Sequence, residues 1–426
     1  MDTQNQQQML WNIRQKTIQM YHFKTLINGA KKVASNPLRL AFTVIVTAIT
    51  CYLTHTATAK QSFLPTLLFT IPIAFIGIVL FMVLLYVQGY VKHSWKYFND
   101  LLRAGFYNAA YEVPLLVKYQ EIDKNRQILT FEGVGFPRTL WEDHQSELET
   151  VFKGYIGQIR EIDRRTVEIV TVANENAFQK ILWDDRNIDW GNDARIILGK
   201  GLVEDIWVDI DKSPMILIGG STGSGKSVLL KTILWQHIKR NNAVVIADFK
   251  GGVDFSDGWH QLTEIITDEE KLLTKLEEIV NELESRKKLF VTHKVKNIGE
   301  YRLKISSDMQ RIIFSCDEIA ELMDKTGATK ERKALLDSIE MCISTIARQG
   351  RAFGIHLVLA TQRPDAQVLN GQIKNNADCR VCGKSDSTLS TIVIGDGRAH
   401  EAIPKDSQGR FINQDGIVFQ GFYFDY

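Results

Sequence analysis

The stretch Ile216-Leu217-Ile218-Gly219-Gly220-Ser221-Thr222-Gly223-Ser224-Gly225-Lys226-Ser227-Val228 decides the fold of this chain. An apolar strand runs through the pattern GxxxxGK[ST] into an apolar-periodic helix. Glycines let backbone N–H groups approach a phosphate chain, and the helix presents its N-terminus to the same anion. An ordinary glycine-rich turn is the alternative, but both flanks fit a nucleotide site. The expected nucleotide contacts are Gly220, Ser221, Thr222, Gly223, Ser224, Gly225, Lys226, Ser227 and Val228.

Around this loop, strands and helices alternate from about Ile196 onward. We expect strands at 215–218, 243–247, 311–316, 355–360 and 379–382, and a helix at 269–289. Such alternation predicts an α/β fold with a mainly parallel sheet wrapped by helices, and it places ligand groups at the carboxyl ends of the strands.

Two of these strands end in polar residues that suit nucleotide hydrolysis. Asp317 and Glu318 follow the strand at 311–316. We expect Asp317 to share Mg²⁺ with Ser227 and Glu318 to polarise the attacking water, with Lys226 reaching the β- and γ-phosphates. The alternative is that the two acids cap the next helix. Gln362 follows the strand at 355–360 and is expected beside the γ-phosphate.

Arginines precede that last strand. Arg348 and Arg351 lie near a helix end that points away from the strand's own tip. In ring ATPases such arginines complete a neighbouring subunit's site. We expect Arg351 to act in this way; a plain surface arginine is the alternative.

The motifs GSTGSGKS, DFKGGVDF from Asp248, DEIAELM from Asp317 and GRAFGIHLVLATQRP from Gly350 together resemble the FtsK/SpoIIIE family of DNA-pumping motors. The resemblance spans about 196–418. It implies a RecA-like motor that binds ATP and Mg²⁺, assembles as a hexamer around DNA and uses Arg351 in trans. Lys250, Lys374 and Arg380 are the candidate contacts to DNA phosphates.

Two apolar segments lie near the N-terminus, at 40–58 and 63–88. At about 19 and 26 residues, each is long enough to span a bilayer. Lys and Arg gather before the first and after the second, which predicts a two-span membrane protein with both termini cytoplasmic. A cleaved signal peptide is the alternative. The expected domains are a basic segment 1–39, a hairpin 40–90, an α+β module 91–207 and the motor 208–426.

Within the module we expect strands at 114–118, 128–132 and 166–172 and an amphipathic helix at 140–159. Cys379 and Cys382 form a CxxC pair without further ligands, so we expect them to be core thiols rather than a zinc site. The net charge of +1 argues against simple non-specific coating of DNA.

The format is short for the family, with two expected spans, almost no linker and no C-terminal DNA-reading domain. It resembles the coupling proteins of conjugative plasmids and integrative elements of Gram-positive bacteria. We therefore expect a DNA translocase that meets a relaxase and a conjugation channel at the cytoplasmic membrane. A chromosome-partitioning pump, a protein-export ATPase and a non-hydrolysing anchor are the alternatives.

Overall fold

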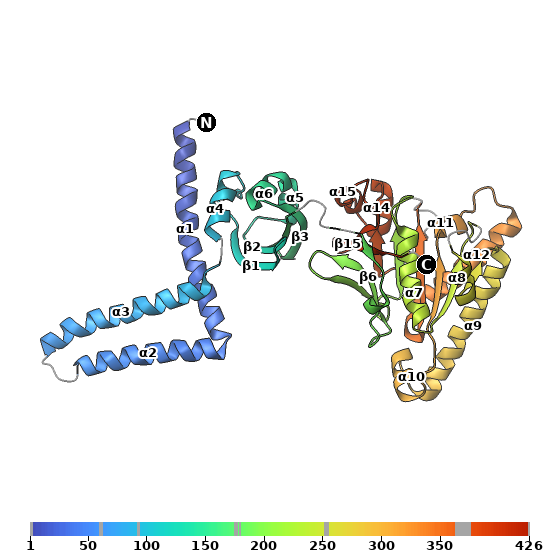
Figure 1. Ribbon diagram of the computed structural model, residues 1–426, viewed down its shortest axis with the longest axis horizontal. Coiled ribbons are helices and arrows are strands. Elements are labelled where there is room, and N and C mark those ends of the chain that lie inside the picture. The colour runs from blue at the N-terminus through green and yellow to red at the C-terminus, as the bar shows by residue number, and fades with distance from the viewer. Residues whose placement is uncertain are drawn as a thin grey trace. The chain divides into compact units, whose positions relative to one another are not determined.

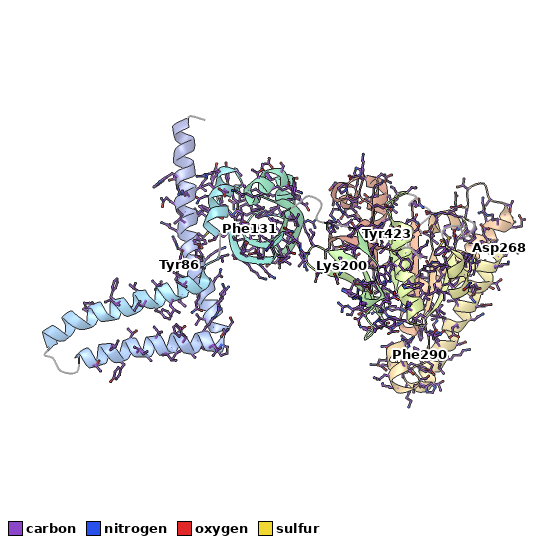
Figure 2. The ribbon with its side chains drawn as sticks, in the orientation of Figure 1. Tyr86, Phe131, Lys200, Asp268, Phe290 and Tyr423 are labelled. Carbon is purple, nitrogen blue, oxygen red and sulfur yellow. The ribbon has the colours of Figure 1, made fainter. Side chains whose placement is uncertain are left out.

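The computed structural model describes residues 3–58, 63–91, 94–173, 178, 180–250, 255–362 and 376–424. The chain forms two compact units, Met1–Ala177 and Phe178–Tyr426. The boundary differs from the expected one at Trp207 because the strands between 195 and 209 pair within the large sheet of the second unit. Figures 1 and 2 show the elements and the side chains.

The first unit combines long helices with a small sheet. Its helices are α1 (Thr3–Ala34), α2 (Pro37–Thr58), α3 (Phe63–Gly89), α4 (Ser94–Arg103), α5 (Arg138–Asp143) and α6 (Gln145–Phe152). Its strands are β1 (Leu115–Asp123), β2 (Arg126–Glu132), β3 (Tyr155–Asp163) and β4 (Thr166–Val172), in the antiparallel order β1-β2-β4-β3. Phe131, labelled in Figure 2, lies in the core between this sheet and helices α4 to α6.

Helix α1 packs against the rest of the first unit rather than standing apart as a separate basic segment. Tyr21 hydrogen-bonds Ser94 at 2.6 Å, and Lys24 pairs with Glu132 at 3.1 Å. A Cβ on Gly29 would lie 1.8 Å from the carbonyl oxygen of Leu85, so α1 and α3 approach each other closely.

Helices α2 and α3 expose many large apolar side chains. By length and composition, no single helix in the part searched qualifies as a membrane span, whereas the pair Trp11–Ala34 and Pro37–Thr50, bent by 107°, meets the criterion jointly. Exposed apolar residues on the two helices include Leu40, Phe42, Ile45, Ile49, Leu53, Ile71, Phe75, Ile76, Ile78 and Leu80.

The predicted helix at 140–159 is wrong beyond Phe152. Lys153 adopts a left-handed conformation with φ 56°, which ends α6. Residues from Tyr155 form β3, which pairs with β4. A Cβ on Gly154 would lie 2.9 Å from the carbonyl oxygen of Val172, so a glycine allows the close approach at the start of β3.

The second unit is built on one large mixed sheet. Its strand order is β10-β9-β11-β12-β8-β13-β14-β15-β6-β7, with β5 pairing β15. The strands are β5 (Ile181–Leu182), β6 (Arg195–Gly201), β7 (Asp205–Asp209), β8 (Met215–Gly219), β9 (Ala243–Ala247), β10 (Glu264–Ile266), β11 (Ile312–Cys316), β12 (Ile355–Thr361), β13 (Cys379–Cys382), β14 (Arg410–Asn413) and β15 (Val418–Tyr423). Strands β9, β11, β12, β8 and β13 pair in parallel, as expected, and β10, which the sequence did not predict, joins them in parallel at the edge. Strands β14, β15, β6 and β7 extend the sheet antiparallel.

Helices cover both faces of this sheet. They are α7 (Lys226–Lys239), α8 (Asp257–Leu262), α9 (Glu269–His293), α10 (Ile298–Lys304), α11 (Ile319–Leu322), α12 (Lys330–Gln349), α14 (Ser387–Ile394) and α15 (Arg398–Ala402), with short 3₁₀ turns η1 (Asp185–Asn187) and η2 (Arg351–Phe353). Apolar side chains of α9 and α12 fill one core, and those of α7 and α8 fill the other. Asp268 caps α9 at the end opposite Phe290, and both are labelled in Figure 2. This architecture is an α/β P-loop ATPase-like fold.

Candidate nucleotide site

The glycine-rich loop joins the carboxyl end of β8 to the first turn of α7. Gly223 and Gly225 have φ of 76° and 95°, in the left-handed region that glycine adopts without strain. A Cβ on Gly225 would also lie 2.9 Å from the backbone of Gly409, so this position has no room for a side chain. Because α7 begins at Lys226, the loop and the helix N-terminus together form an anion-binding cradle.

Asp317 lies at the centre of the charged part of the site. Its Oδ1 accepts hydrogen bonds from Lys226 Nζ at 3.1 Å and Ser227 Oγ at 3.2 Å. Its Oδ2 accepts a bond of 2.6 Å from Lys250 Nζ, and its backbone carbonyl accepts one of 2.6 Å from Lys226 Nζ. Lys226 and Ser227, expected at the nucleotide and its metal, therefore meet one buried carboxylate together with Lys250, which was expected at DNA.

The two acids have opposite pKa shifts. Burial by itself raises the pKa of Asp317, but the charge of Lys226 and the hydrogen bond from Lys250 outweigh it, so the pKa is lowered. Burial also raises the pKa of Glu318, and there the effect of burial exceeds that of Lys226 and the hydrogen bonds. A carboxylate with a raised pKa is the better proton acceptor near neutral pH. Asp317 is thus suited to holding a cation and Glu318 to activating water.

Glu318 is held by the end of the neighbouring strand. Its carboxylate accepts hydrogen bonds from Thr361 Oγ1 at 2.9 Å and from the backbone N–H of Gln362 at 2.9 Å. The Gln362 side chain in turn accepts a 3.0 Å bond from Thr222 Oγ1, in the glycine-rich loop. Thr222, Glu318 and Gln362 therefore form one chain of contacts.

The residues fit Mg²⁺. Carboxylate and hydroxyl oxygens are the ligands that this ion prefers, and Asp317 and Ser227 present one of each within 3.2 Å. Across the described ranges, no cluster of three or more His, Cys, Asp or Glu side chains is placed to hold a metal. A cation between Ser227 and Asp317 would thus complete its shell with phosphate and water oxygens, as Mg²⁺ commonly does.

Arg351 lies away from this site. Its Nε donates to the carbonyl oxygen of Asp211 at 2.9 Å. Arg351 precedes β12 while Gln362 follows it, so the length of that strand, about 20 Å at roughly 3.3 Å per residue, separates them. The arginine therefore makes no contact with its own chain's phosphate loop, which is compatible with the expected action in trans.

The three expected DNA contacts do not gather on one described surface. Lys250 lies in the nucleotide site, bound to Asp317. Arg380 is in β13, where its Nε donates to the carbonyl oxygen of Ala377 at 2.8 Å. Lys374 lies outside the described residues. Cys379 and Cys382 are buried free thiols, as expected.

Sequence reasoning missed the supports behind the loop. The N–H of Gly409 donates to the Ser224 carbonyl at 2.8 Å, and the N–H of Ser221 donates to the Lys384 carbonyl at 2.8 Å. A Cβ on Gly383 would lie 3.1 Å from Ser224 Cβ. These contacts come from backbone groups distant in sequence, so no side-chain motif marks them.

Comparison with known proteins identifies the family of this chain. Residues 188–366 match the FtsK/SpoIIIE family. The solved structure of the pCW3 conjugation coupling protein TcpA, a monomer with ATPγS, is 37% identical, with a TM-score of 0.59 over 78% of this chain and 96% of that one. The chain belongs to the FtsK/SpoIIIE family.

Curated FtsK/SpoIIIE relatives are longer than this chain. The DNA translocase FtsK of Campylobacter jejuni is 36% identical over 220 residues, which are 49% of this chain and 22% of that protein. The DNA translocase FtsK of Helicobacter pylori is 37% identical over 213 residues, 47% of this chain and 24% of the relative. The chain thus spans about a quarter of the length of these relatives.

Proposed function

We propose that this chain is a membrane-anchored, ATP-driven DNA translocase that serves as a coupling protein in conjugative transfer. The observation that carries the proposal is the convergence of Lys226, Asp317 and Glu318 at one edge of the sheet. Membership of the FtsK/SpoIIIE family and the similarity to a conjugation coupling protein support DNA as the substrate.

In the proposed cycle, Lys226 leaves Asp317 and binds the β- and γ-phosphates of ATP. Ser227 and Asp317 would hold Mg²⁺, which would supply charge neutralisation at the phosphate oxygens. Glu318 takes the proton of the attacking water, which contributes about 10²–10⁴ in rate. Gln362 links the water-activating carboxylate to Thr222 in the loop, so it responds to the presence of the γ-phosphate.

The proposed assembly is a hexameric ring. Because Arg351 is about a strand length away from its own loop, we assign it to the site of a neighbouring copy, where it stabilises transition-state charge. Lys374 and Arg380 are the proposed contacts to DNA phosphates, whereas Lys250 is bound to Asp317 in the nucleotide site. Their contribution is electrostatic, so it should weaken as salt rises.

The proposed anchor is the helical pair α2 and α3, which crosses the cytoplasmic membrane twice and leaves both termini in the cytoplasm. The many exposed apolar side chains on these helices support it, because a large exposed apolar surface is typical of a membrane or protein contact. The proposed partners at the membrane are a relaxase bound to DNA and the proteins of a conjugation channel.

The test is ATP turnover by the full chain in lipid nanodiscs, with no DNA, single strands or duplex, and with Lys226→Ala as the inactive control. Stimulation by either form of DNA supports the translocase, and the preferred form identifies the transferred strand. A turnover indifferent to DNA would favour a protein-export ATPase instead. Mating assays with the Lys226→Ala chain test the conjugative role, which predicts loss of DNA transfer.

A further inference from the structure

A second charged cluster lies at the opposite edge of the sheet from the nucleotide site. Its centre is Arg311, which directly precedes β11 and is only 1% exposed. The guanidinium donates to Asp193 Oδ2 at 2.9 Å and to both carboxylate oxygens of Asp211 at 2.7 and 3.1 Å. A buried arginine with two carboxylate partners holds its surroundings in a fixed geometry, because its planar fork fits them in only one orientation.

The cluster joins segments that are distant in sequence. Arg302 of α10 donates to Asp193 as well, and Arg311 Nη1 lies 3.1 Å from Nε2 of His356 in β12. An arginine only donates hydrogen bonds, so this nitrogen of His356 accepts. Burial, followed by the charge of Arg311, lowers the pKa of His356 well below its usual value, which keeps the ring neutral and able to accept.

The same cluster holds the segment that supports Arg351. Arg311 binds the carboxylate of Asp211, and the backbone carbonyl of Asp211 accepts the Nε–H of Arg351. Across the described ranges, the exposed Arg351 makes no hydrogen bond or ion pair through its two terminal nitrogens. One side of the guanidinium is therefore fixed to its own chain while the other side is presented outward.

We propose that Arg311 is a positioning residue: through Asp211 it orients Arg351 toward the nucleotide site of a neighbouring copy. The inference rests on the proposed function, in which Arg351 acts in trans. It assigns a catalytic effect to an arginine that is far from its own chain's ATP site and that the motifs do not mark.

The test combines full-length variants in mixed assemblies. Lys226→Ala chains cannot hydrolyse ATP but still donate Arg351, whereas Arg351→Ala chains keep their own phosphate loop. Mixing the two restores turnover if Arg351 acts in trans. The decisive mixture pairs Arg351→Ala with the double variant Lys226→Ala, Arg311→Lys, whose Arg351 has lost its support. Here we expect turnover about 10²-fold below the first mixture, since small misplacements of a catalytic group have effects of this size.

The Arg311→Lys chain by itself should show a lowered kcat with an unchanged KM for ATP, because its own phosphate loop is intact. Mixing it with Lys226→Ala chains should restore turnover. The matched control is Arg332→Lys, at a surface pair with Glu269 of 2.9 Å, and it should leave turnover unchanged. If Arg311→Lys does not fold, as judged by thermal unfolding, Asp211→Asn replaces it in every mixture with the same expected result.

The outcomes separate the two proposals. If Lys226→Ala and Arg351→Ala chains do not complement each other, the trans role of Arg351 is wrong, and the inference is overturned with it. If they complement, and the double variant rescues Arg351→Ala as well as Lys226→Ala alone does, Arg311 has no positioning role while the trans role of Arg351 stands. Loss of rescue by the double variant alone supports the inference.

Discussion

Replacing Asp317 by Asn should destabilise the nucleotide-free second unit. The side chains of Lys226 and Asp317 are 3% and 1% exposed, so the change leaves a buried ammonium without its strongest counter-charge. Removing one partner of a buried pair usually costs about 3–5 kcal/mol. For a unit of this size each kcal/mol lowers the melting temperature by roughly 2–4 °C, so we expect a fall of about 6–20 °C.

The measurement is thermal unfolding of the full chain with a chelator present and no nucleotide, following the transition that an ATP analogue shifts. The matched control is Glu278→Gln, which removes an exposed carboxylate 2.9 Å from Lys275. An exposed pair contributes about 0–1 kcal/mol, so the control should change the melting temperature by at most about 4 °C. A fall in Asp317→Asn no larger than in the control would refute the view that this carboxylate neutralises the buried lysine.

The pH dependence of this difference provides a second check. Because the pKa of Asp317 is lowered below its ordinary 3.8, its stabilising effect is complete above that pH and is lost as the pH falls through the folded value. The melting temperatures of the native chain and Asp317→Asn should therefore converge in acid. A gap that persists with the carboxyl group protonated would mean that the amide disturbs packing rather than charge.

Three further predictions concern the same unit. Glu318→Gln should lower phosphate release by about 10²–10⁴ while leaving the affinity for a fluorescent ATP analogue unchanged; an unchanged rate would assign water activation to another group. Burial, aided by the charge of Arg240, lowers the pKa of His237 from 6.5 to about 3, so each pH unit between 6.5 and about 3 costs about 1.4 kcal/mol of stability. Melting curves should fall less steeply with acid in His237→Asn, and equal slopes would contradict this. Gly225→Ala, at φ 95°, should weaken binding of the ATP analogue about tenfold. The effect should exceed that of Gly223→Ala, whose added Cβ would have no atom within 4 Å. Equal effects would place the strain elsewhere.

The parallel strands of the second unit were predictable because most are short buried apolar runs, and β9, β11 and β12 are followed directly by polar residues. The ranges Ala243–Ala247 and Cys379–Cys382 match the predicted bounds, and the helix from Glu269 extends only four residues beyond the predicted end at Leu289. In α/β folds, site residues lie at the carboxyl ends of the strands, so Asp317 and Gln362 could be placed at the candidate site once the strands were located.

The region after Leu140 was not predictable from periodicity alone. Val151, Phe152, Tyr155 and Ile159 have helical spacing, yet the chain leaves the helix at Lys153 and pairs as a strand with β4. The decisive fact is a backbone approach at Gly154, which local sequence does not report. Lys250 is a similar case: a lysine that contacts DNA and one that binds a buried carboxylate look the same in sequence, and its partner Asp317 is 67 residues away.

The cluster around Arg311 marks the limit of such reasoning. A charged residue before an apolar run reads as the exposed start of a strand, because buried arginines are rare unless they are paired. Its partners Asp193 and Asp211 are 118 and 100 residues away, and only the order of the strands brings them together. Strands β11 and β12 begin at this cluster, and Glu318 and Gln362 follow their other ends. Motifs mark the end that carries the candidate nucleotide site, whereas the opposite end is fixed by contacts between residues that are distant in sequence and carry no motif.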